Sequence, residues 1–293
     1  MSDAPHLYEL ISGTTHLYGI MGSPVSHSWS PRMHTFAFQY HKLDCVYVPF
    51  PVQPEHLARA VAGAVALGVS GFNVTIPHKE AIMAHLHTVS PEARFIGAVN
   101  TVLVQEGQTI GYNTDGEGFL QPLQAVAPPL TQRTGCVLGA GGAARALTMA
   151  LLQAGCPALT IANRTPERAE RLVAALQERF PQAAVQAIPF AKAAECARTS
   201  TLLVNATSVG LHQTDEPLLP DTCFHPEQVV YDIVYRPLDT PLLQAARRRG
   251  ATVISGLDML IGQGAAAFTI WTGLPFPIAA VRRMLQSLLS TTP

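Results

Sequence analysis

The residues best able to do acid–base chemistry sit in polar clusters that interrupt the apolar N-terminal part of this chain. The clusters are Ser26–Ser30 (SHSWS), Asn73–Lys79 (NVTIPHK), the pair Asn100-Thr101 and the triplet Asn113-Thr114-Asp115. Each cluster lies either at the end of a predicted apolar strand or at the start of a predicted helix. Turn formation explains any single cluster of this kind. Together they indicate a pocket for a polyhydroxylated small molecule, because they combine a lysine, an aspartate and several neutral donors and acceptors.

The ionisable pair of this set is Lys79 and Asp115. In an enclosed pocket, a lysine and an aspartate can pass a proton to or from an alcohol while a hydride moves to a nicotinamide. The carboxylate would hold the ammonium group in position. The residue types therefore predict a dehydrogenase that acts on an alcohol or ketone, without fixing which member of the pair holds the proton.

Residues 136–155, CVLGAGGAARALTMALLQAG, predict a strand, a glycine turn and a helix. Gly139, Gly141 and Ala144 match the pattern G-x-G-x-x-[G/A], in which glycines let the backbone approach a pyrophosphate at a helix N-terminus. A plain strand–helix turn is the alternative. The preceding strand and the following apolar helix favour dinucleotide binding.

The next predicted strand ends at Asn163-Arg164-Thr165, where an NAD site would place an acidic residue against the ribose. Arg164 can pair with a 2′-phosphate instead, which favours NADP. A solvated arginine is the alternative, but a cation at a helix N-terminus is unfavourable without an anion. A later strand ends at Asn205-Ala206-Thr207; a contact with the nicotinamide half and simple turn chemistry explain it equally well.

Strand and helix patterns alternate along the chain, which predicts an α/β fold with parallel sheets covered by helices on both faces. The predicted strands are 17–21, 45–50, 71–76, 98–104, 109–113, 136–140, 159–163, 202–207, 229–234 and 252–255. Ser30, Thr165 and Thr240 each precede a proline, which predicts three N-capped helix starts. The proline-rich stretch 121–133 is weakly patterned and is a candidate join between domains.

The composition is that of a globular enzyme. Charged residues make up 13% of the 293 residues and the net charge is −1, which gives no electrostatic reason to expect nucleic acid or a membrane surface as partner. No apolar run is long enough to predict a transmembrane helix. The N-terminus lacks a signal-peptide pattern, and the five scattered cysteines predict neither disulfides nor a zinc site. We expect a cytoplasmic protein that binds no metal.

In its ordered series of motifs, the chain resembles the shikimate dehydrogenase family. The motifs are GSPVSHSWSP, NVTIPHK, GAVNT, YNTDGEGF, GAGGAA, NRT, NATSVG, YDIVYRP and GLDMLIGQGAAAFTIWTG. The resemblance implies an NADPH-dependent reduction of 3-dehydroshikimate to shikimate. It also implies a substrate domain from residues 1–114 and 256–293, and a Rossmann-type NADP-binding domain from residues 115–255, with the C-terminal helices returning to the substrate domain.

The resemblance also implies residue roles. Lys79 and Asp115 match the family's catalytic pair. The positions matching substrate contacts are Ser28, Ser30, Thr75, Asn100, Tyr235 and Gln263. The positions matching cofactor contacts are Gly139, Ala140, Gly141, Gly142, Ala143, Asn163, Arg164, Thr165, Thr207 and Gly256. Ala144 replaces a hydroxyl residue that many relatives carry, and Asp258 receives no role.

Several alternatives stay open at this level. A quinate/shikimate dehydrogenase that uses NAD is the nearest one, although Ser30 and Asn163-Arg164-Thr165 resemble the shikimate-specific, NADP-using branch. A non-catalytic metabolite sensor would not need both Lys79 and Asp115. A dehydrogenase of a folate or an amino acid would not need the paired serines or Gln263. The sequence leaves monomer and homodimer undecided.

Overall fold

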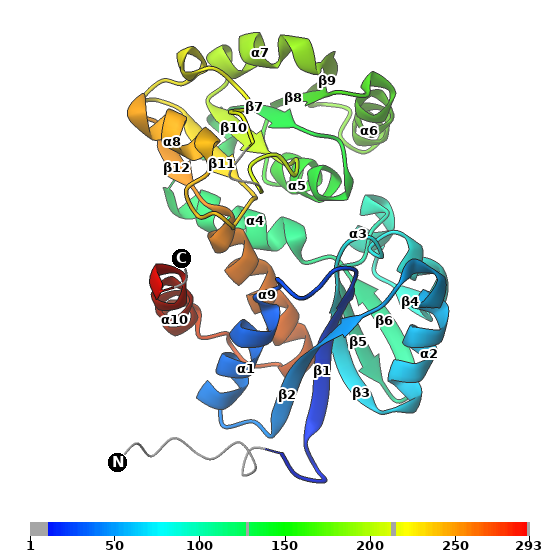
Figure 1. The fold of residues 1–293 in the computed structure, drawn as a ribbon. Coiled ribbons are helices and arrows are strands. Elements are labelled where there is room, and N and C mark those ends of the chain that lie inside the picture. Colours follow the sequence, from blue (N-terminus) through cyan, green and yellow to red (C-terminus); the bar gives the residue numbers. More distant parts are fainter. Residues whose placement is uncertain (1–10, 127–128, 212–214, 292–293) are drawn as a thin grey trace. The chain divides into compact units, whose positions relative to one another are not determined.

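A computed structural model describes residues 11–126, 129–211 and 215–291, and Figure 1 shows its ribbon. The chain divides into two compact units, each with its own sheet. Unit 1 contains the described residues up to Thr114 and from Gly264 onward, and unit 2 contains Asp115–Gln263. The second division lies inside helix α9 (Gly256–Thr272), a few residues beyond the position 256 that we expected from the sequence.

Unit 1 is built on a mixed six-stranded sheet with the order β2-β1-β3-β5-β6-β4 among the described residues. Its strands are β1 (His16–Gly22), β2 (Cys45–Pro51), β3 (Val69–Val74), β4 (Thr88–Val89), β5 (Thr101–Gln105) and β6 (Gln108–Tyr112). Its helices are α1 (Ser30–Tyr40), α2 (Leu57–Ala66), α3 (Pro91–Ile96), α10 (Ile278–Thr291), the end of α9, and the short turns η2 (Pro54–His56) and η3 (Ala81–His85).

The expectation of wholly parallel sheets was wrong for unit 1. Strands β1, β2 and β3 are parallel, but β5 is antiparallel to both β3 and β6. A two-residue hairpin reverses the chain between β5 and β6, and in it Glu106 has φ 52° and Gly107 has φ 74°. Two central residues with positive φ match the twist of paired antiparallel strands. The hairpin presents the start of β5 and the end of β6 at one edge.

Two different cores cover the two faces of the sheet in unit 1. One core is mainly aliphatic and packs α2 and α3 against β3 and β5, with Phe72, Ile82 and Val102 fully buried. The helix α2 behaves as its sequence predicts: Leu57, Val61 and Ala64 are buried, and the chain leaves the helix at Gly68, where φ is +71°.

The other core is aromatic and lies under α1 and α9. His34 is fully buried there, stacked on Tyr47 with 4.7 Å between ring centroids and 5.1 Å from the centroid of Trp271. Among the described residues, neither ring nitrogen of His34 has a hydrogen-bond partner. Burial lowers the pKa of His34 to about 3, and the nearby Asn73 amide opposes this without reaching hydrogen-bond geometry.

Unit 2 holds a six-stranded parallel sheet with the order β12-β11-β10-β7-β8-β9. Its strands are β7 (Thr134–Leu138), β8 (Ala158–Asn163), β9 (Ala184–Pro189), β10 (Leu202–Asn205), β11 (Val229–Asp232) and β12 (Thr252–Ile254). Its helices are α4 (Asp115–Val126), α5 (Gly142–Gln153), α6 (Pro166–Arg179), α7 (Ala193–Thr199), α8 (Pro241–Arg248) and the start of α9. The short turns are η4 (Leu130–Gln132), η5 (Phe190–Lys192) and η6 (Asp221–Cys223).

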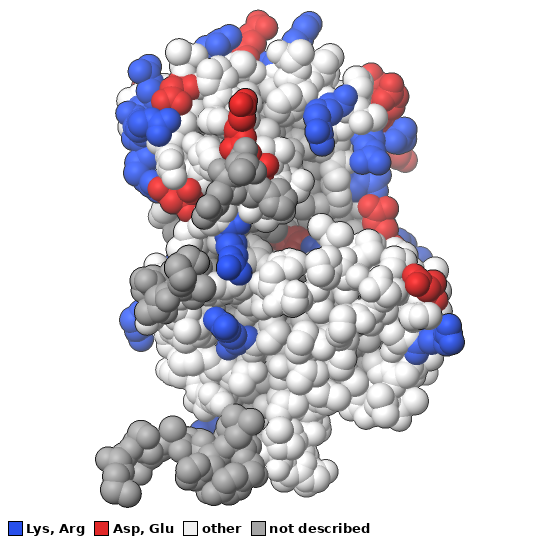
Figure 2. All heavy atoms as spheres, viewed as in Figure 1, with Lys and Arg blue, Asp and Glu red and all other residues white. Residues whose placement is uncertain are grey.

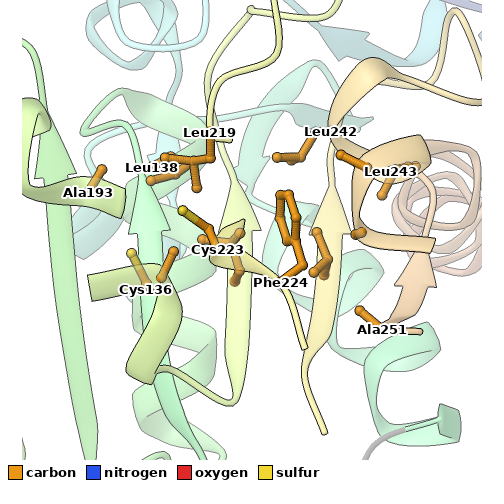
Figure 3. Packing of buried hydrophobic residues seen from close by; sticks show 14 of the residues in the cluster. Cys136, Leu138, Ala193, Leu219, Cys223, Phe224, Leu242, Leu243 and Ala251 are labelled. Atoms are coloured by element: carbon orange, nitrogen blue, oxygen red, sulfur yellow. The ribbon is translucent and has the colours of Figure 1, made fainter. Parts of the chain in front are cut away.

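Helices cover both faces of this sheet. Numbered from β7, the strand order is that of a Rossmann fold, with its switch point between β7 and β10. Figure 3 shows the core under α7 and α8, where Leu138, Cys223 and Phe224 are buried together. On the other face α4 packs by aromatic stacking, with 4.6 Å between the ring centroids of Phe119 and Tyr231. The predicted α/β fold class is therefore confirmed.

Several local predictions differ from the structure. The strands β4 and β9 were not predicted, and β3 ends at Val74 instead of residue 76. The candidate join at 121–133 was wrong, because residues 121–126 continue helix α4 with Pro122 inside it; residues 127–128 lie outside the described residues. Of the three predicted N-caps, only Thr240 caps its helix with its side chain, accepting from the Leu243 N–H; Ser30 is instead the first residue of α1.

The surface carries charges of both signs. In the face that Figure 2 shows, basic and acidic side chains are interspersed over α7 and α8. Near these helices, Arg247 pairs with Asp239 at 2.7 Å and Arg248 with Asp221 at 3.0 Å. That face has no single-sign patch of the kind that binds nucleic acid. Among the described residues, no helix has the length and apolar composition needed to cross a membrane.

The buried His34 predicts acid sensitivity of unit 1. Because its folded pKa lies below that of an exposed histidine, the unfolded chain takes up the proton first. Stability is therefore complete above about pH 6.5 and falls by up to about 1.4 kcal/mol per pH unit toward pH 3. We expect His34→Phe to remove this slope. Urea unfolding followed by tryptophan fluorescence measures it, because Trp29 and Trp271 both lie in unit 1.

The control for this experiment is His85→Asn, since His85 is exposed on η3. It should keep the full pH dependence of the wild-type protein. An unchanged slope in His34→Phe would show that the buried imidazole is not the group that titrates.

Candidate functional site

The carboxyl end of β3 is fixed by a buried hydrogen-bond network centred on Asn73. The Tyr47 hydroxyl donates to Asn73 Oδ1 at 2.7 Å, and Asn73 Nδ2 donates to the Asn100 carbonyl at 3.2 Å and to Thr101 Oγ1 at 3.1 Å. Asn73, Tyr47 and Thr101 are all nearly inaccessible to solvent. Buried polar groups of this kind lock a local structure because each lost partner is costly. Asn73 therefore holds neighbouring strands together at their ends.

Asn100 joins this network to the segment that follows β6. Its Oδ1 accepts from the Thr114 backbone N–H at 2.8 Å, and its Nδ2 donates to Thr114 Oγ1 at 3.0 Å. The Asn113 side chain adds a bond to the Ala98 carbonyl at 2.9 Å. Three of the four polar clusters of the sequence are thus connected by direct hydrogen bonds. The next residue along the chain is Asp115, which is 4% exposed and begins helix α4 of unit 2.

The loop that carries Lys79 is held from both sides. The ring of His78 is buried and donates from Nε2 to the Val52 carbonyl at 2.7 Å. The Lys79 carbonyl accepts from the Val99 N–H at 2.8 Å, one residue before Asn100. Thr75 packs its methyl group against Gly22, where any side chain would collide. Thr75 and Lys79 are half-buried, so unit 1 brings Thr75, Lys79 and Asn100 to one edge of its sheet.

The serine pair lies where the chain enters α1. Ser30 is 4% exposed, and its backbone N–H lies 3.3 Å from the half-buried Ser28 Oγ. The N-cap residue is Trp29, whose side chain makes no capping bond. Ser28 is therefore the side chain that accepts from the backbone at the start of α1. Burial raises the pKa of Tyr47 well above its usual value, and the Ser30 hydroxyl opposes that rise.

The glycine turn of unit 2 lies at the switch point of its sheet. Gly139 has φ +106°, and a Cβ added there would lie 3.0 Å from the Ala206 carbonyl oxygen. The turn thus packs directly against the end of β10, which only glycine permits. A Cβ added at Gly141 would meet nothing within 4 Å, and α5 starts there with no capping side chain. Ala144 is fully buried, so this third position of the motif packs the helix onto the sheet.

The segment after β8 is the predicted 2′-phosphate clamp. Arg164 and Thr165 are exposed, and Asn163 Nδ2 donates to the Thr165 carbonyl at 2.8 Å. Thr165 occupies the N-cap position of α6, but its side chain does not cap the helix. A cation thus stands beside an uncapped helix N-terminus, which is favourable only with an anion present.

The segment after β10 is held by a buried aspartate. Asp232 Oδ1 accepts from Asn205 Nδ2 at 2.9 Å and from the Val234 N–H at 3.0 Å, and Oδ2 accepts from Thr240 Oγ1 at 2.6 Å. Burial raises the pKa of Asp232 to about 6 despite these bonds. The Thr207 hydroxyl donates to Asn205 Oδ1 at 2.7 Å, and this bond within the turn is enough to explain a threonine at position 207. Its cofactor role stays a prediction.

Two close backbone contacts position the start of α9. A Cβ added at Gly256 would collide with the Ile233 carbonyl, and one added at Gly118 in α4 would collide with the backbone of Gln263. Gly262 meets Gly118 in the same way, with its added Cβ 2.7 Å from the Gly118 carbonyl oxygen. The helices α4 and α9 therefore cross with almost no side chain between them. Gln263 is half-buried at this crossing.

Tyr235 follows β11 and is also half-buried. Burial raises the pKa of its phenol, and the Arg236 charge opposes the rise. Tyr235 and Gln263 both belong to unit 2. Their roles toward a substrate, like that of Asp115, stay predictions.

Sequence reasoning missed the residues that position the site. Tyr47, Asp232 and Gly118 received no role, although each holds a predicted site segment in place. Asp232 did leave a signal, because it is a carboxylate in the middle of the apolar strand VVYDIV. Tyr47 left none, since tyrosine is ordinary in a strand. Among the described residues, no cluster of side chains could hold a metal ion.

The parallel sheet of unit 2, with a glycine turn at its switch point, defines the class of Rossmann-fold dinucleotide-binding proteins. Comparison with family models identifies the family within this class. Residues 20–102 match the shikimate dehydrogenase substrate binding domain, and residues 123–219 match shikimate / quinate 5-dehydrogenase. Residues 256–286 match the shikimate 5′-dehydrogenase C-terminal domain. The chain belongs to the shikimate dehydrogenase family.

Individual relatives cover nearly the whole chain. Shikimate dehydrogenase (NADP(+)) from Moorella thermoacetica is 46% identical over 96% of this chain and 96% of its own length. The structure of the Thermus thermophilus shikimate 5-dehydrogenase with NADP(H) and shikimate is 43% identical, with TM-score 0.82 over 92% of this chain and 99% of that one. Quinate dehydrogenase from Corynebacterium glutamicum with NAD is 29% identical, with TM-score 0.86 over 93% and 99% of the two chains.

The α4–α9 crossing predicts an unusual sensitivity to a single methyl group. Gly118→Ala should destabilise unit 2 by about 1–3 kcal/mol, because the new Cβ meets backbone that cannot rotate away. Urea unfolding followed by circular dichroism measures the change. Gly63→Ala in the middle of α2 is the matched control, since nothing lies within 4 Å of its added Cβ. That control should gain about 0.5–1 kcal/mol; equal effects of both substitutions would contradict the tight crossing.

Proposed function

We propose that the protein catalyses the reversible NADPH-dependent reduction of 3-dehydroshikimate to shikimate, a step toward aromatic amino acids through chorismate. The observation that carries the proposal is the 46% identity along nearly the full length of a shikimate dehydrogenase (NADP(+)). The polar clusters of this chain add chemical support, because Thr75, Lys79 and Asn100 meet at one sheet edge.

The substrate is a ring with a carboxylate and several hydroxyl groups, and the proposed contacts divide accordingly. Ser28 and Ser30 bind the carboxylate with help from Tyr235. The uncapped start of α1 supports this assignment, since helix N-terminal N–H groups favour an anion. Thr75, Asn100 and Gln263 bind the ring hydroxyls. The buried network around Asn73 and Thr114 holds Asn100 in a fixed orientation for that task.

The residues of unit 2 fit a dinucleotide with a 2′-phosphate. The open space at Gly141 and the uncapped start of α5 suit a pyrophosphate held by the backbone of Gly139–Ala143. Arg164, with Asn163 and Thr165, binds the 2′-phosphate at the uncapped start of α6. Thr207 and the backbone of Gly256 lie toward the nicotinamide in this assignment. NADP, when bound, supplies the hydride chemistry.

Lys79 and Asp115 manage the proton in this mechanism. During reduction the pair delivers a proton to the carbonyl oxygen that becomes the alcohol, and in the reverse direction it removes that proton. Hydrogen bonds fix the backbone next to both residues. His78 and Val99 fix the backbone around Lys79, and Asp115 directly follows Thr114 of the Asn100 network.

Rates with shikimate and quinate, each with NADP and NAD, test the proposed activity. We expect the shikimate and NADP combination to be fastest by a wide margin. The competing outcome is that quinate with NAD is fastest, because this chain also resembles a quinate dehydrogenase whose structure contains NAD. A preference for that combination would refute the proposal.

Lys79→Ala should lower kcat by about 100-fold to 10,000-fold, the usual contribution of a positioned acid or base. The affinity for NADP should stay within twofold of the wild type, because Lys79 belongs to unit 1 and the glycine turn to unit 2. Steady-state rates and isothermal titration with NADP measure the two effects. Lys192→Ala, which removes an exposed lysine on η5, should change neither; an unchanged kcat in Lys79→Ala would exclude the proton-transfer role.

Arg164→Ala should weaken NADP binding by about 10-fold to 100-fold, the loss expected for hydrogen bonds to a charged group. Binding of shikimate and of NAD should remain nearly unchanged, because neither carries the 2′-phosphate. Isothermal titration with each ligand makes the comparison. Arg168→Ala, which removes an exposed arginine from helix α6 just after this segment, is the control and should bind NADP normally. Equal losses for NADP and NAD would contradict the phosphate contact.

The cellular setting follows from the same chemistry. All five cysteines are free thiols, which suits a reducing cytoplasm that also provides NADPH. A homodimer is the assembly that we propose to test first, since most soluble oligomers are twofold symmetric. Light scattering over a range of concentrations distinguishes it from a monomer.

A further inference from the structure

A cavity of about 450 Å³ lies between α7 and the sheet of unit 2. Polar side chains on its wall come from β8, β9, η5 and α7: Thr160, Gln186, Lys192, Glu195, Cys196 and Ser200. Its floor includes Thr134 and Ala158, the first residues of β7 and β8. The glycine turn instead follows the other end of β7. The cavity is therefore separate from the dinucleotide site, and none of the proposed catalytic residues lines it.

The strands place a row of polar groups under α7. Cys136, Thr160 and Gln186 are neighbours in register across β7, β8 and β9. Gln186 Nε2 donates to Thr160 Oγ1 at 3.1 Å, which fixes the row. Above the row, Cys196 and Ser200 are one helical turn apart, with 3.7 Å between Cys196 Sγ and Ser200 Oγ. Cys196 thus faces hydroxyl groups and open space, while Cys136 beneath it is fully buried.

The surroundings of Cys196 favour its thiolate. Cys196 packs against the buried cluster that contains Cys136. The Cys136 side chain is the main cause that lowers the pKa of Cys196 to about 6, and the hydroxyls of Ser200 and Thr160 add to it. Burial and the Glu195 carboxylate oppose this shift, and Lys192 is the cation on the cavity wall. The Cys196 side chain, together with burial, raises the pKa of Cys136. Cys223, in the cluster that Figure 3 shows with Cys136, also has a raised pKa, caused by burial.

We propose that Cys196 is a modification site for small hydroperoxides, and that Cys136 is the thiol that condenses with it after oxidation. The Cys196 thiolate attacks one peroxide oxygen, the O–O bond breaks, and the other oxygen leaves as hydroxide or alkoxide. Cys196 is then a sulfenic acid. The Cys136 thiol attacks that sulfur, the S–O bond breaks, and water leaves with the thiol proton as the disulfide forms. One peroxide thus takes two electrons from the two thiols.

Hydrogen peroxide on the full-length protein, followed by peptide mass mapping, tests this assignment. We expect a disulfide between the peptides of Cys136 and Cys196, with Cys45 still reduced. Cys45 is a suitable internal reference, because burial raises its pKa to about 11. In Cys136→Ala the sulfenic acid should persist and be trapped by dimedone at Cys196. Cys196→Ser should leave Cys136 reduced.

Wild-type protein alone also decides the question, should a variant fold poorly. Alkylation of Cys196 by iodoacetamide should be half-maximal near pH 6, about two pH units or more below an ordinary thiol. Oxidation of Cys45 as fast as Cys196, or alkylation of Cys196 with an ordinary thiol profile, would overturn the proposal. So would a sulfenic acid that lasts as long in the wild type as in Cys136→Ala.

Discussion

The buried amide of Asn73 is the interaction on which the candidate site of unit 1 depends. It connects Tyr47 on β2 with Asn100 and Thr101 at the start of β5, and Asn100 passes the connection to Thr114 after β6. Without this network, the ends of three strands would carry unpaired polar groups in the protein interior, which is costly. The same bonds that satisfy the backbone therefore also orient the side chain of Asn100, which we predict to be a substrate contact. The Asn73 network therefore both stabilises unit 1 and preorganises its candidate site.

Unit 2 uses backbone contact where unit 1 uses polar side chains. Its glycine turn touches the end of β10, its α9 start touches Ile233, and α4 crosses α9 at Gly118 and Gly262. Each contact exists because a side chain is missing. These glycine positions offer no functional group, and only their geometry shows why they are glycines.

Much of the architecture followed from sequence pattern. The alternation of strands and helices predicted the α/β class, and the glycine motif predicted a glycine turn between a strand and a helix. The Glu106-Gly107 hairpin was not predicted, because the pattern of its two short strands does not differ from that of a parallel pair. Ser30 and Thr165 looked like helix caps, but neither side chain makes a capping bond. What the sequence could not provide was the cross-chain pairing of Asn73 with Tyr47 and of Asn205 with Asp232, because such pairs have no fixed spacing.

The two buried ionisable groups respond to acid in opposite ways. His34 in unit 1 has a pKa lowered to about 3, so its burial lowers the free energy of unfolding as the pH falls. Asp232 in unit 2 has a pKa raised to about 6, so acid relieves the cost of burying its charge. Mild acidification thus weakens one half of the chain while strengthening the other. The order in which the two halves unfold is then set by pH as well as by their cores.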